Sequence, residues 1–319
     1  MSNTVKNLEV IDIVLSIYNQ EKIIARVLSG IFDNTTTPFN LILIFDGCTD
    51  ASMQIALDHV KKENPPLMKE FITTTATNVY ETKANNIGFK LGKEKYLLTI
   101  QDDIVICEKG WERRLTFPIR AFNDVFAVSA RAALNPYFND DSSYPLYRDK
   151  AGREFFTLKR NQFKIRSVIN RGPIAFDADV LRKLNFLDEA FAPAQLDEAD
   201  LVLRAREQLG LKSGVFSVYY RSDAAWGKTR SADSSMNTGK TLAKNGELLK
   251  SRHFMQAKAF SETRTVPADS IDYIETDSLP ARIKNFAFDF KQSLLLYMTR
   301  KYNSIRHSVA TKIKKLLRL

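Results

Sequence analysis

The sequence predicts an α/β fold built on a mostly parallel sheet, and three observations support this prediction. Apolar runs of strand length alternate with amphipathic helical patterns over residues 10–100. Several of these runs are almost continuously apolar, which is typical of strands that are buried on both faces. Polar residues follow the ends of the runs, as ligand-binding residues do at the carboxyl ends of strands in open α/β sheets. Together these features predict one sheet with helices on both faces.

The predicted elements of the first part of the chain alternate without interruption. Apolar runs mark the strands, and apolar residues that recur every three or four positions mark the helices. Starting with a strand and alternating with helices, the elements are Val10–Ile17, Glu21–Phe32, Leu41–Phe45, Ser52–Lys62, Phe71–Thr75, Lys83–Leu91 and Tyr96–Ile100. Because a helix joins each strand to the next, neighbouring strands are expected to be parallel.

The second part of the chain is less regular. Residues 135–166 are rich in Tyr, Asp, Ser and Arg without clear periodicity, so irregular structure or a small β excursion is expected. A strand-like run over Arg171–Phe176 and a helix over Asp179–Leu184 follow. A further helix over Glu198–Leu209 ends before Gly210, which is a typical C-capping residue.

The net charge of +10 is concentrated at the C-terminus. Residues 280–319 hold ten Lys or Arg and one acidic residue, which leaves 37 basic and 36 acidic residues in the rest of the chain. The predicted organisation is a domain over residues 1–262, a polar linker over residues 263–279 and a basic tail over residues 280–319. Apolar residues recur every three or four positions in the tail, so amphipathic helices are expected there.

Two interpretations of the basic tail remain open. Its helices could bind an anionic membrane surface, or they could pack against the body of the protein or a second subunit. Nucleic acid is not an expected partner, because the chain shows no aromatic stacking platform and no recognised binding motif beside these charges.

The cysteines and histidines do not suggest a disulfide framework or a zinc site. The chain has two Cys and three His, and none of them form a cluster with metal-ligand spacing. The N-terminus lacks the pattern of a secretory signal, and the longest apolar stretch of the tail, Ser293–Met298, is too short to span a bilayer. A cytoplasmic location is expected, at the inner face of the membrane if the tail binds lipid.

Two adjacent aspartates interrupt an apolar run. Tyr96–Ile106 reads YLLTIQDDIVI and contains Asp102 and Asp103. Adjacent carboxylates repel each other and are costly to desolvate, so they require an exposed strand end or a cation. A polar turn between two short strands is the simpler alternative. Polar residues also follow two other strands, at Ser16–Asn19 and Asp46–Asp50, and we expect all three strand ends to converge on one ligand site.

Four sequence motifs follow one another along the chain. They are a strand and helix opening that ends in an Asp-Gly turn, an Asn-rich helix, an aspartate pair and an acidic helix start. In that order they are Ile13–Asp50, Lys83–Gly88, Gln101–Asp103 with Gly110-Trp111, and Asn170–Phe176 continuing to Leu196–Ala205. Together they resemble family 2 glycosyltransferases of the GT-A fold, over residues 9–230.

The resemblance implies a Rossmann-like α/β/α sandwich and an inverting glycosyltransferase. Such an enzyme moves a sugar from a nucleotide-diphosphate donor to a hydroxyl of a glycan or lipid-linked acceptor, in the synthesis of surface polysaccharide or glycoconjugates. Charge builds up on the departing diphosphate, so a divalent metal, Mn²⁺ or Mg²⁺, is the expected cofactor. The family places a metal ligand at Asp103, and at Asp102 a residue that reaches the ribose or assists the metal.

The resemblance also implies a donor site at the strand ends. Asp46 could accept a hydrogen bond from the nucleotide base and Tyr18 could stack on it, with Ser16 as a lesser candidate. The alternatives are a turn-forming Asp46, a core aromatic at Tyr18 and a capping role for Ser16.

Three basic residues are further candidates for donor binding. Lys83 opens the second motif, and Lys228 and Arg230 lie in a segment that could close over the diphosphate. For Lys228 and Arg230, an exposed basic loop is the alternative.

A base for the acceptor hydroxyl is expected at the start of the last predicted helix of the domain. Glu198 stands where family members usually carry Asp, and Asp197 is its neighbour or substitute. Helix capping is the alternative for both, because helix N-termini stabilise carboxylates. Asp200 and Arg204 are four residues apart on that helix, which predicts an ion pair between them.

Two departures from the family pattern keep a second interpretation open. Gln101 replaces the first carboxylate of the Asp-x-Asp motif, and Tyr219-Tyr220-Arg221 stands where many members carry a metal-binding His. Both departures favour weaker metal dependence, or a catalytically silent domain that binds nucleotide or glycan as a scaffold. A nucleotidyltransferase would share the sheet, but Ser16–Lys22 contains no glycine for a phosphate loop.

Overall fold

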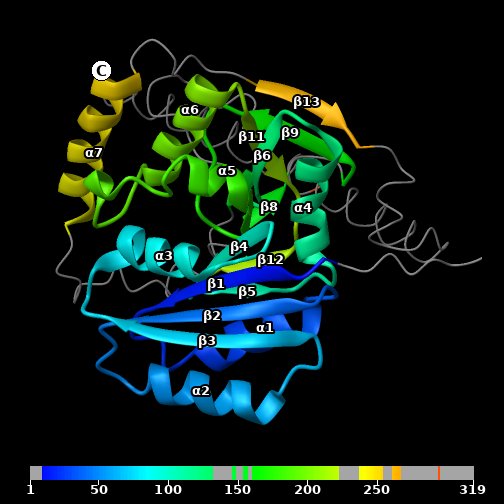
Figure 1. Cartoon of the computed structure of the whole chain (residues 1–319), viewed down its shortest axis with the longest axis vertical. Coiled ribbons are helices and arrows are strands. Elements are labelled where there is room, and N and C mark those ends of the chain that lie inside the picture. Colours follow the sequence, from blue (N-terminus) through cyan, green and yellow to red (C-terminus); the bar gives the residue numbers. More distant parts are fainter. Residues whose placement is uncertain are drawn as a thin grey trace, which may run out of the picture.

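A nine-stranded mixed sheet forms the centre of the protein (Figure 1). The computed structural model describes residues 9–131, 146–148, 154–156, 160–222, 237–253, 261–266 and 294. Across the sheet the strands are ordered β13-β9-β11-β6-β10-β4-β1-β2-β3. In that order they span Ser261–Thr265, Gln162–Arg166, Lys212–Phe216, Val125–Ser129, Ile174–Asp177, Tyr96–Gln101, Ile11–Ile17, Phe39–Asp46 and Met68–Ala76.

Most strands of this sheet run in one direction. β1 pairs in parallel with β2 and β4, β2 pairs in parallel with β3, and β6 pairs in parallel with β11. β10 is antiparallel to β4 and β6, and β9 is antiparallel to β11 and β13. The predicted α/β class with a mostly parallel central sheet is therefore confirmed.

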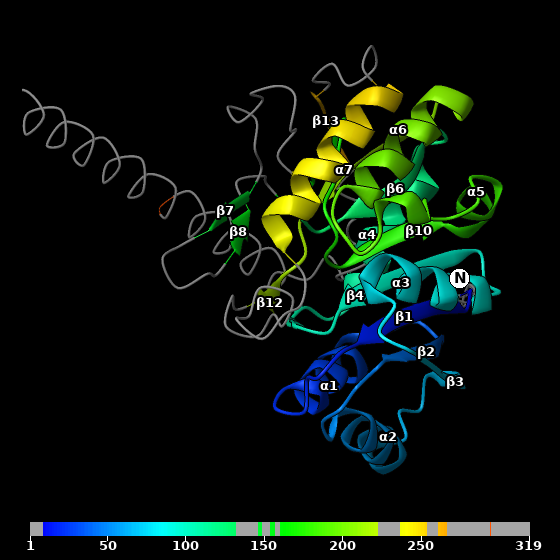
Figure 2. The same cartoon turned by 90° about the vertical axis from the view of Figure 1, so that its left-hand side faces the viewer.

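Helices cover both faces of the sheet. α1 (Ile24–Asn34) and α2 (Ser52–Glu63) pack together below β1 to β3 in Figures 1 and 2, and α3 (Tyr80–Leu91) lies on the opposite face. The other helical elements are α4 (Trp111–Ala121), α5 (Ala178–Lys183), α6 (Asp197–Leu209), α7 (Thr238–His253) and the 3₁₀ helix η2 (Glu189–Phe191). Two small antiparallel sheets pair β5 (Ile104–Ile106) with β12 (Tyr220–Ser222), and β7 (Leu146–Arg148) with β8 (Glu154–Phe156).

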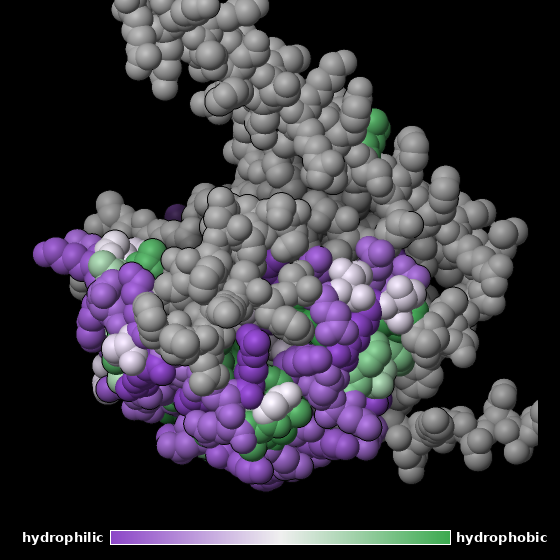
Figure 3. All heavy atoms as spheres, turned by 90° about the horizontal axis from the view of Figure 1, so that it is seen from above, coloured by the Kyte–Doolittle hydropathy of each residue, from purple (hydrophilic) through white to green (hydrophobic). Residues whose placement is uncertain are grey.

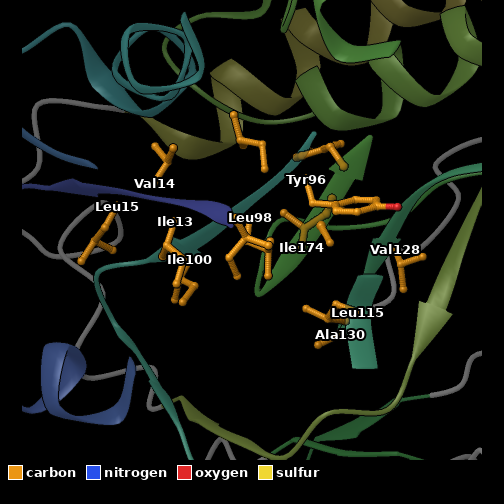
Figure 4. Close-up of a cluster of buried hydrophobic side chains, with 14 of the residues drawn as sticks. Ile13, Val14, Leu15, Tyr96, Leu98, Ile100, Leu115, Val128, Ala130 and Ile174 are labelled. Carbon is orange, nitrogen blue, oxygen red and sulfur yellow. The ribbon is translucent and has the colours of Figure 1, made fainter. Parts of the chain in front are cut away.

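The central strands are buried on both faces, as their continuous apolar sequences predict. Figure 4 shows Val14 on one face of β1, and Ile13 and Leu15 on the other. α3 lies very close to the sheet, because a Cβ atom at Gly88 would lie 2.3 Å from Cγ1 of Val14. The glycine of the second motif therefore serves the packing of the helix on the sheet.

Several predicted boundaries differ from the observed ones. α3 begins at Tyr80 rather than Lys83, because the carboxylate of Asp46 accepts hydrogen bonds from the amides of Val79 and Tyr80 and caps the helix earlier. Of the two alternatives predicted for residues 135–166, the β excursion is present at residues 162–166, which form β9, but this strand belongs to the main sheet.

The predicted boundary between domain and linker, at residues 262 and 263, falls within strand β13. Polar β13 lies at the edge of the sheet, where Arg264 pairs with Asp124 at 2.6 Å and with Glu262 at 2.8 Å. Backbone pairing with β9 and these ion pairs hold the strand, so its polar sequence resembles a linker. Val266, just after β13, is buried, and the rest of the predicted linker and the predicted basic tail lie outside the described residues, apart from Leu294.

No helix within the described ranges is long and apolar enough to cross a membrane. Where described residues are visible from above, hydrophilic side chains cover most of the surface and apolar ones form small patches (Figure 3).

Candidate active site

The two adjacent aspartates lie in the turn between β4 and β5, next to the carboxyl end of β1. The backbone amide of Tyr18 donates to Oδ2 of Asp102 at 2.8 Å, and the side chain of Gln20 donates to Oδ1 at 3.3 Å. Burial, and next the charge of Asp103, hold the pKa of Asp102 well above its ordinary value. We refer to Asp102 and Asp103 as the aspartate turn, and its crowded negative charge is one that a cation would relieve.

The aspartate turn suits a cation that takes only some of its ligands from the protein and the others from a bound substrate. Among the described residues, no three Asp, Glu, His or Cys side chains are grouped so as to hold a metal ion by themselves. Two carboxylates supply hard oxygen ligands, and Mg²⁺ commonly binds one or two carboxylates together with substrate phosphates and water. The donor set therefore suits Mg²⁺ or Mn²⁺ beside a diphosphate.

Asp197 and Glu198 begin helix α6, and both side chains are buried. Oδ2 of Asp197 accepts a hydrogen bond from the hydroxyl of Thr82 at 2.7 Å and contacts a guanidinium nitrogen of Arg171. Oε1 of Glu198 contacts Nε of the same Arg171. The residue at the N-cap position is Leu196, which makes no capping bond. These carboxylates are thus held mainly by Arg171 rather than by the helix end.

Arg171 is a site residue that the sequence-based reasoning missed. It is 5% exposed, and its Nη1 lies 3.0 Å from Oε1 of Glu81, so one guanidinium faces three carboxylates. Burial alone would lower the pKa of Arg171, but Asp197, Glu198 and Glu81 raise it well above its usual value. We call Arg171, Glu81, Asp197 and Glu198 the carboxylate cluster. Its sequence signal was an arginine just before an apolar strand, a position where a charge needs a partner.

One arginine cannot neutralise three carboxylates, and the two helix-start acids differ as a result. Burial would raise the pKa of Asp197, but Arg171 and the hydrogen bonds from Glu198 and Thr82 lower it. Burial also raises the pKa of Glu198, and although Arg171 opposes this, the adjacent Asp197 keeps it well above the ordinary value. Asp197 therefore stays ionised while Glu198 holds a proton more readily, which is the separation expected of an acid–base residue and its charged neighbour.

Gln101 connects the aspartate turn to the carboxylate cluster. Its side-chain amide donates to Oε1 of Glu81 at 2.9 Å, and its side-chain oxygen accepts from Nη1 of Arg131 at 3.4 Å. An aspartate at this position would direct a negative charge toward Glu81. Because Glu81 lies beside position 101, the neutral Gln101 avoids the repulsion that an aspartate would cause there.

The other residues predicted to bind the sugar donor lie at the same sheet edge. Asp46 and Ser16 are engaged in hydrogen bonds, whereas Tyr18 is exposed. Both oxygens of Asp46 accept backbone amides at 2.7 Å, as described for α3, so its turn-forming role is present. Ser16 donates to Oδ1 of Asn85 at 2.7 Å. Tyr18 is 36% exposed, so the alternative of a core aromatic is wrong.

The strand ends are also tied to each other, as predicted. Oδ1 of Asn19 accepts from the amide of Thr49 at 2.8 Å, and Oδ2 of Asp50 accepts from the amide of Glu21 at 3.1 Å. The turn after β2 therefore lies against the turn after β1, and the latter holds Asp102. The three strand ends therefore lie together at one edge of the sheet, and their forming one ligand site stays a prediction.

Lys83 is exposed on α3, and Lys228 and Arg230 lie outside the described residues. The predicted ion pair between Asp200 and Arg204 is present at 2.6 Å. The segment Tyr219-Tyr220-Arg221 has no His at the position expected for a metal ligand. Arg221 belongs to the short strand β12, and this strand pairs with β5.

A mostly parallel sheet covered by helices on both faces, with acidic residues at the ends of its strands, is the architecture of the GT-A class of proteins. The chain belongs to glycosyl transferase family 2, whose sequence model matches residues 12–185. The match ends before α6, so the roles of Asp197 and Glu198 depend on the geometry of the site.

Two curated relatives are bacterial. An uncharacterized glycosyltransferase of Haemophilus influenzae is 26% identical over 164 residues, which are 51% of this chain and 62% of the relative. Glycosyltransferase GlyG of Streptococcus pneumoniae is 23% identical over 164 residues, 51% of this chain and 50% of the relative. The matched part thus spans between half and two thirds of these relatives.

Among solved structures, the chain is similar to glucosyl-3-phosphoglycerate synthase of Mycobacterium tuberculosis. That structure contains Mn²⁺, uridine diphosphate and glucosyl-3-phosphoglycerate, and the likeness has a TM-score of 0.53 at 14% identity. It covers 82% of this chain and 88% of the synthase chain. A likeness at this identity establishes the shared fold.

Proposed function

We propose that the protein transfers a sugar from a nucleotide-diphosphate donor to a hydroxyl of a glycan or lipid-linked acceptor, with inversion at the anomeric carbon. One observation carries this proposal. Gln101, next to Asp102, joins the aspartate turn to the carboxylate cluster at one sheet edge. Its side chain donates a hydrogen bond to Glu81, and Glu81 forms an ion pair with Arg171. A site for a diphosphate and a residue suited to proton transfer therefore lie in one connected network.

The aspartate turn would hold the diphosphate end of the donor. Asp103 and Asp102 would bind Mn²⁺ or Mg²⁺, and the cation would stabilise negative charge on the departing diphosphate. Tyr18, exposed beside this turn and bonded to Asp102 through its amide, lies where a nucleoside can stack. Ser16 and Asp46 support the same edge by fixing α3 behind it.

Glu198 would accept the proton of the attacking hydroxyl. Transfer to a hydroxyl requires a base within hydrogen-bond reach of the attacking oxygen, with a pKa near the working pH. Burial, and next the charge of Asp197 against the opposing Arg171, raise the pKa of Glu198 above its ordinary value, which is the direction that a base requires. Oδ1 of the neighbouring Asp197 is buried without a hydrogen-bond partner among the described residues. Such an oxygen is costly to leave unsatisfied, and a bound hydroxyl would supply a donor.

Arg171 would position both acids rather than react. Its guanidinium contacts Asp197, Glu198 and Glu81 from three nitrogens, and this fixes the direction of each carboxylate. The cluster carries excess negative charge when all its acids are ionised. An oxocarbenium-like sugar, which develops positive charge as the donor bond breaks, would be stabilised beside it.

Donor turnover tests this proposal. UDP-, GDP- and dTDP-sugars would be incubated with the wild type and with Asp103→Asn, in Mn²⁺ or Mg²⁺, and release of nucleoside diphosphate would be measured. We expect turnover of at least one donor class, and a loss of about 100-fold or more in Asp103→Asn, because that variant weakens charge stabilisation at the leaving group.

Asp177→Asn is the matched control. Asp177 caps helix α5 through the amides of Asp179 and Val180, and asparagine caps a helix equally well, so turnover should be unchanged. A wild type that binds a donor but never turns it over would support the scaffold alternative instead. A wild type that binds none of the donors would overturn the proposal.

A further inference from the structure

The loop just before α6 has an unfavourable backbone. Gln195 and Leu196 have φ values of 82° and 67°, in the left-handed region that residues with a side chain rarely adopt. Two consecutive residues in this region persist only when surrounding contacts impose them. Because Asp197 and Glu198 follow directly, these contacts also set the direction in which Glu198 leaves the loop.

Asn245 of helix α7 supplies those contacts. Its side chain is fully buried, and Nδ2 lies within hydrogen-bond distance of the carbonyl oxygens of Phe191 at 2.7 Å, Ala194 at 2.9 Å and Gln195 at 2.9 Å. The amide has two N–H groups, so one of them is shared between two of these carbonyls. One amide group therefore holds three carbonyls of the segment that leads into α6. None of them belongs to its own helix, so the side chain is dedicated to the loop.

Thr82 of α3 holds the same loop at a neighbouring carbonyl. Its amide donates to the carbonyl of Pro193 at 3.2 Å, and its hydroxyl donates to Asp197 at 2.7 Å. The loop is thus fixed between α3, which also carries Glu81, and α7.

Helix α7 has other attachments that do not involve Asn245. Its last residue, His253, lies 2.9 Å from Asp200 and 2.6 Å from Glu207, both on α6. Leu249 is fully buried in a small apolar cluster that includes Phe191 and Leu203. Figure 2 shows α7, in yellow, alongside α6. These contacts attach α7 to α6 without Asn245. The effect of Asn245 on the loop can therefore be tested separately from the attachment of the helix.

We infer that Asn245 is a positioning residue for Glu198. By holding the Ala194 and Gln195 carbonyls, it imposes the left-handed backbone that places the Glu198 carboxylate against Arg171 and toward the acceptor. This inference rests on the proposed function for the role of Glu198, but the anchoring of the loop can be measured without activity.

The kinetic test uses Asn245→Asp, which keeps the shape but replaces the donating amide by a group that, when ionised, only accepts. We expect kcat for transfer to fall about 100-fold, since a small misplacement of a reacting group has effects of this size. The Kd of the nucleoside diphosphate with Mn²⁺ should change less than about threefold, because the aspartate turn is untouched. The pH dependence of kcat should shift as Glu198 leaves its place beside Arg171 and Asp197.

The matched control is Leu249→Ala, which truncates the apolar cluster beneath α7 but keeps the Asn245 amide and its hydrogen bonds to the loop carbonyls. It should lower Tm as much as Asn245→Asp while retaining kcat within about threefold at a temperature where both proteins are folded. If Asn245→Asp does not fold, Asn245→Ser, which retains one hydroxyl donor, enters the same comparison. Equal losses of kcat in the Asn245 variant and in Leu249→Ala would overturn the inference.

Hydrogen exchange provides the readout that does not depend on catalysis. In the folded Asn245 variant, amide exchange should rise over residues 194–199 relative to both wild type and Leu249→Ala. Unchanged exchange there would overturn the inference even if activity falls. A wild type that turns over no donor would overturn the proposed function alone, and the exchange result would still decide whether Asn245 anchors the loop.

Discussion

Replacing Arg171 by methionine should destabilise the protein by about 3–5 kcal/mol and abolish sugar transfer. Arg171 is the cation that contacts Asp197, Glu198 and Glu81 in the described structure, and it is 5% exposed. Without Arg171, the negative charges of three neighbouring carboxylates would repel one another in a buried place, and the folded state would lose stability. Chemical denaturation at neutral pH measures the loss.

The deficit of Arg171→Met should depend on pH in a defined direction. In the wild type, Arg171 lowers the pKa of Asp197 below its unfolded value. A carboxylate with a depressed pKa contributes stability above its unfolded pKa, about 3.9 for Asp, and this stability is lost as pH falls through the lower folded pKa. The difference between wild type and Arg171→Met should therefore be full near neutrality and shrink in acid.

An exposed ion pair supplies the control for Arg171→Met. Lys93 lies 3.5 Å from Glu70 with both side chains largely exposed, so Lys93→Met should cost at most about 1 kcal/mol. A second variant, Arg171→Lys, keeps the charge but loses the planar group that reaches three carboxylates, so it should retain more stability than activity. If Arg171→Met were as stable as Lys93→Met, the carboxylate cluster would not be organised around this arginine.

Glu198→Gln should abolish most turnover while leaving the folded protein at least as stable. Removing the base should reduce kcat by about 10²–10⁴-fold. The stability effect follows from the raised pKa of Glu198, which arises first from burial and then from Asp197. A carboxyl with a raised folded pKa stabilises the fold below its unfolded value, about 4.3, and this contribution is lost as pH rises through the folded pKa. Glutamine carries no charge, so Glu198→Gln should gain in relative stability as pH rises.

The same shift predicts the wild-type pH profile of kcat. Activity should rise with pH as Glu198 loses its proton, with a midpoint above the ordinary carboxyl value, and the residual activity of Glu198→Gln should lack this rise. Glu112→Gln is the matched control, since Glu112 is also buried with a raised pKa but bonds Thr36, on the loop after α1. That variant should keep both the rate and the pH profile. A Glu198→Gln enzyme with wild-type kcat would remove Glu198 from the chemistry.

The order of strands and helices up to β4 was predictable, because each element there has an uninterrupted apolar or periodic pattern. The predicted boundary at residues 262 and 263 missed strand β13. This strand pairs with β9 through its backbone, and its side chains are mostly polar, so its sequence resembles a linker. α3 extends to Tyr80 because Asp46, distant in sequence, caps it.

The candidate site was predictable where acids follow strands, and less so where a charge is buried. Motif order and spacing pointed to the aspartate turn and Glu198 as site residues. Arg171 was missed because periodicity does not reveal which distant acids surround a buried cation. Asn245 has no sequence signal, since an asparagine within a polar helix looks the same whether it faces solvent or three carbonyls. Such contacts between distant segments become visible only in the folded structure.

If Glu198 acts as a base in a single displacement, transfer inverts the configuration at the anomeric carbon, so the stereochemistry of the product decides whether it does. Proton NMR of the first product formed by the wild type from an α-linked nucleotide sugar would report the anomeric configuration before any later equilibration. A base that activates the acceptor on the face opposite the departing diphosphate produces a β-linked product, which is the result we expect. An α-linked product would show retention and contradict the assignment of Glu198.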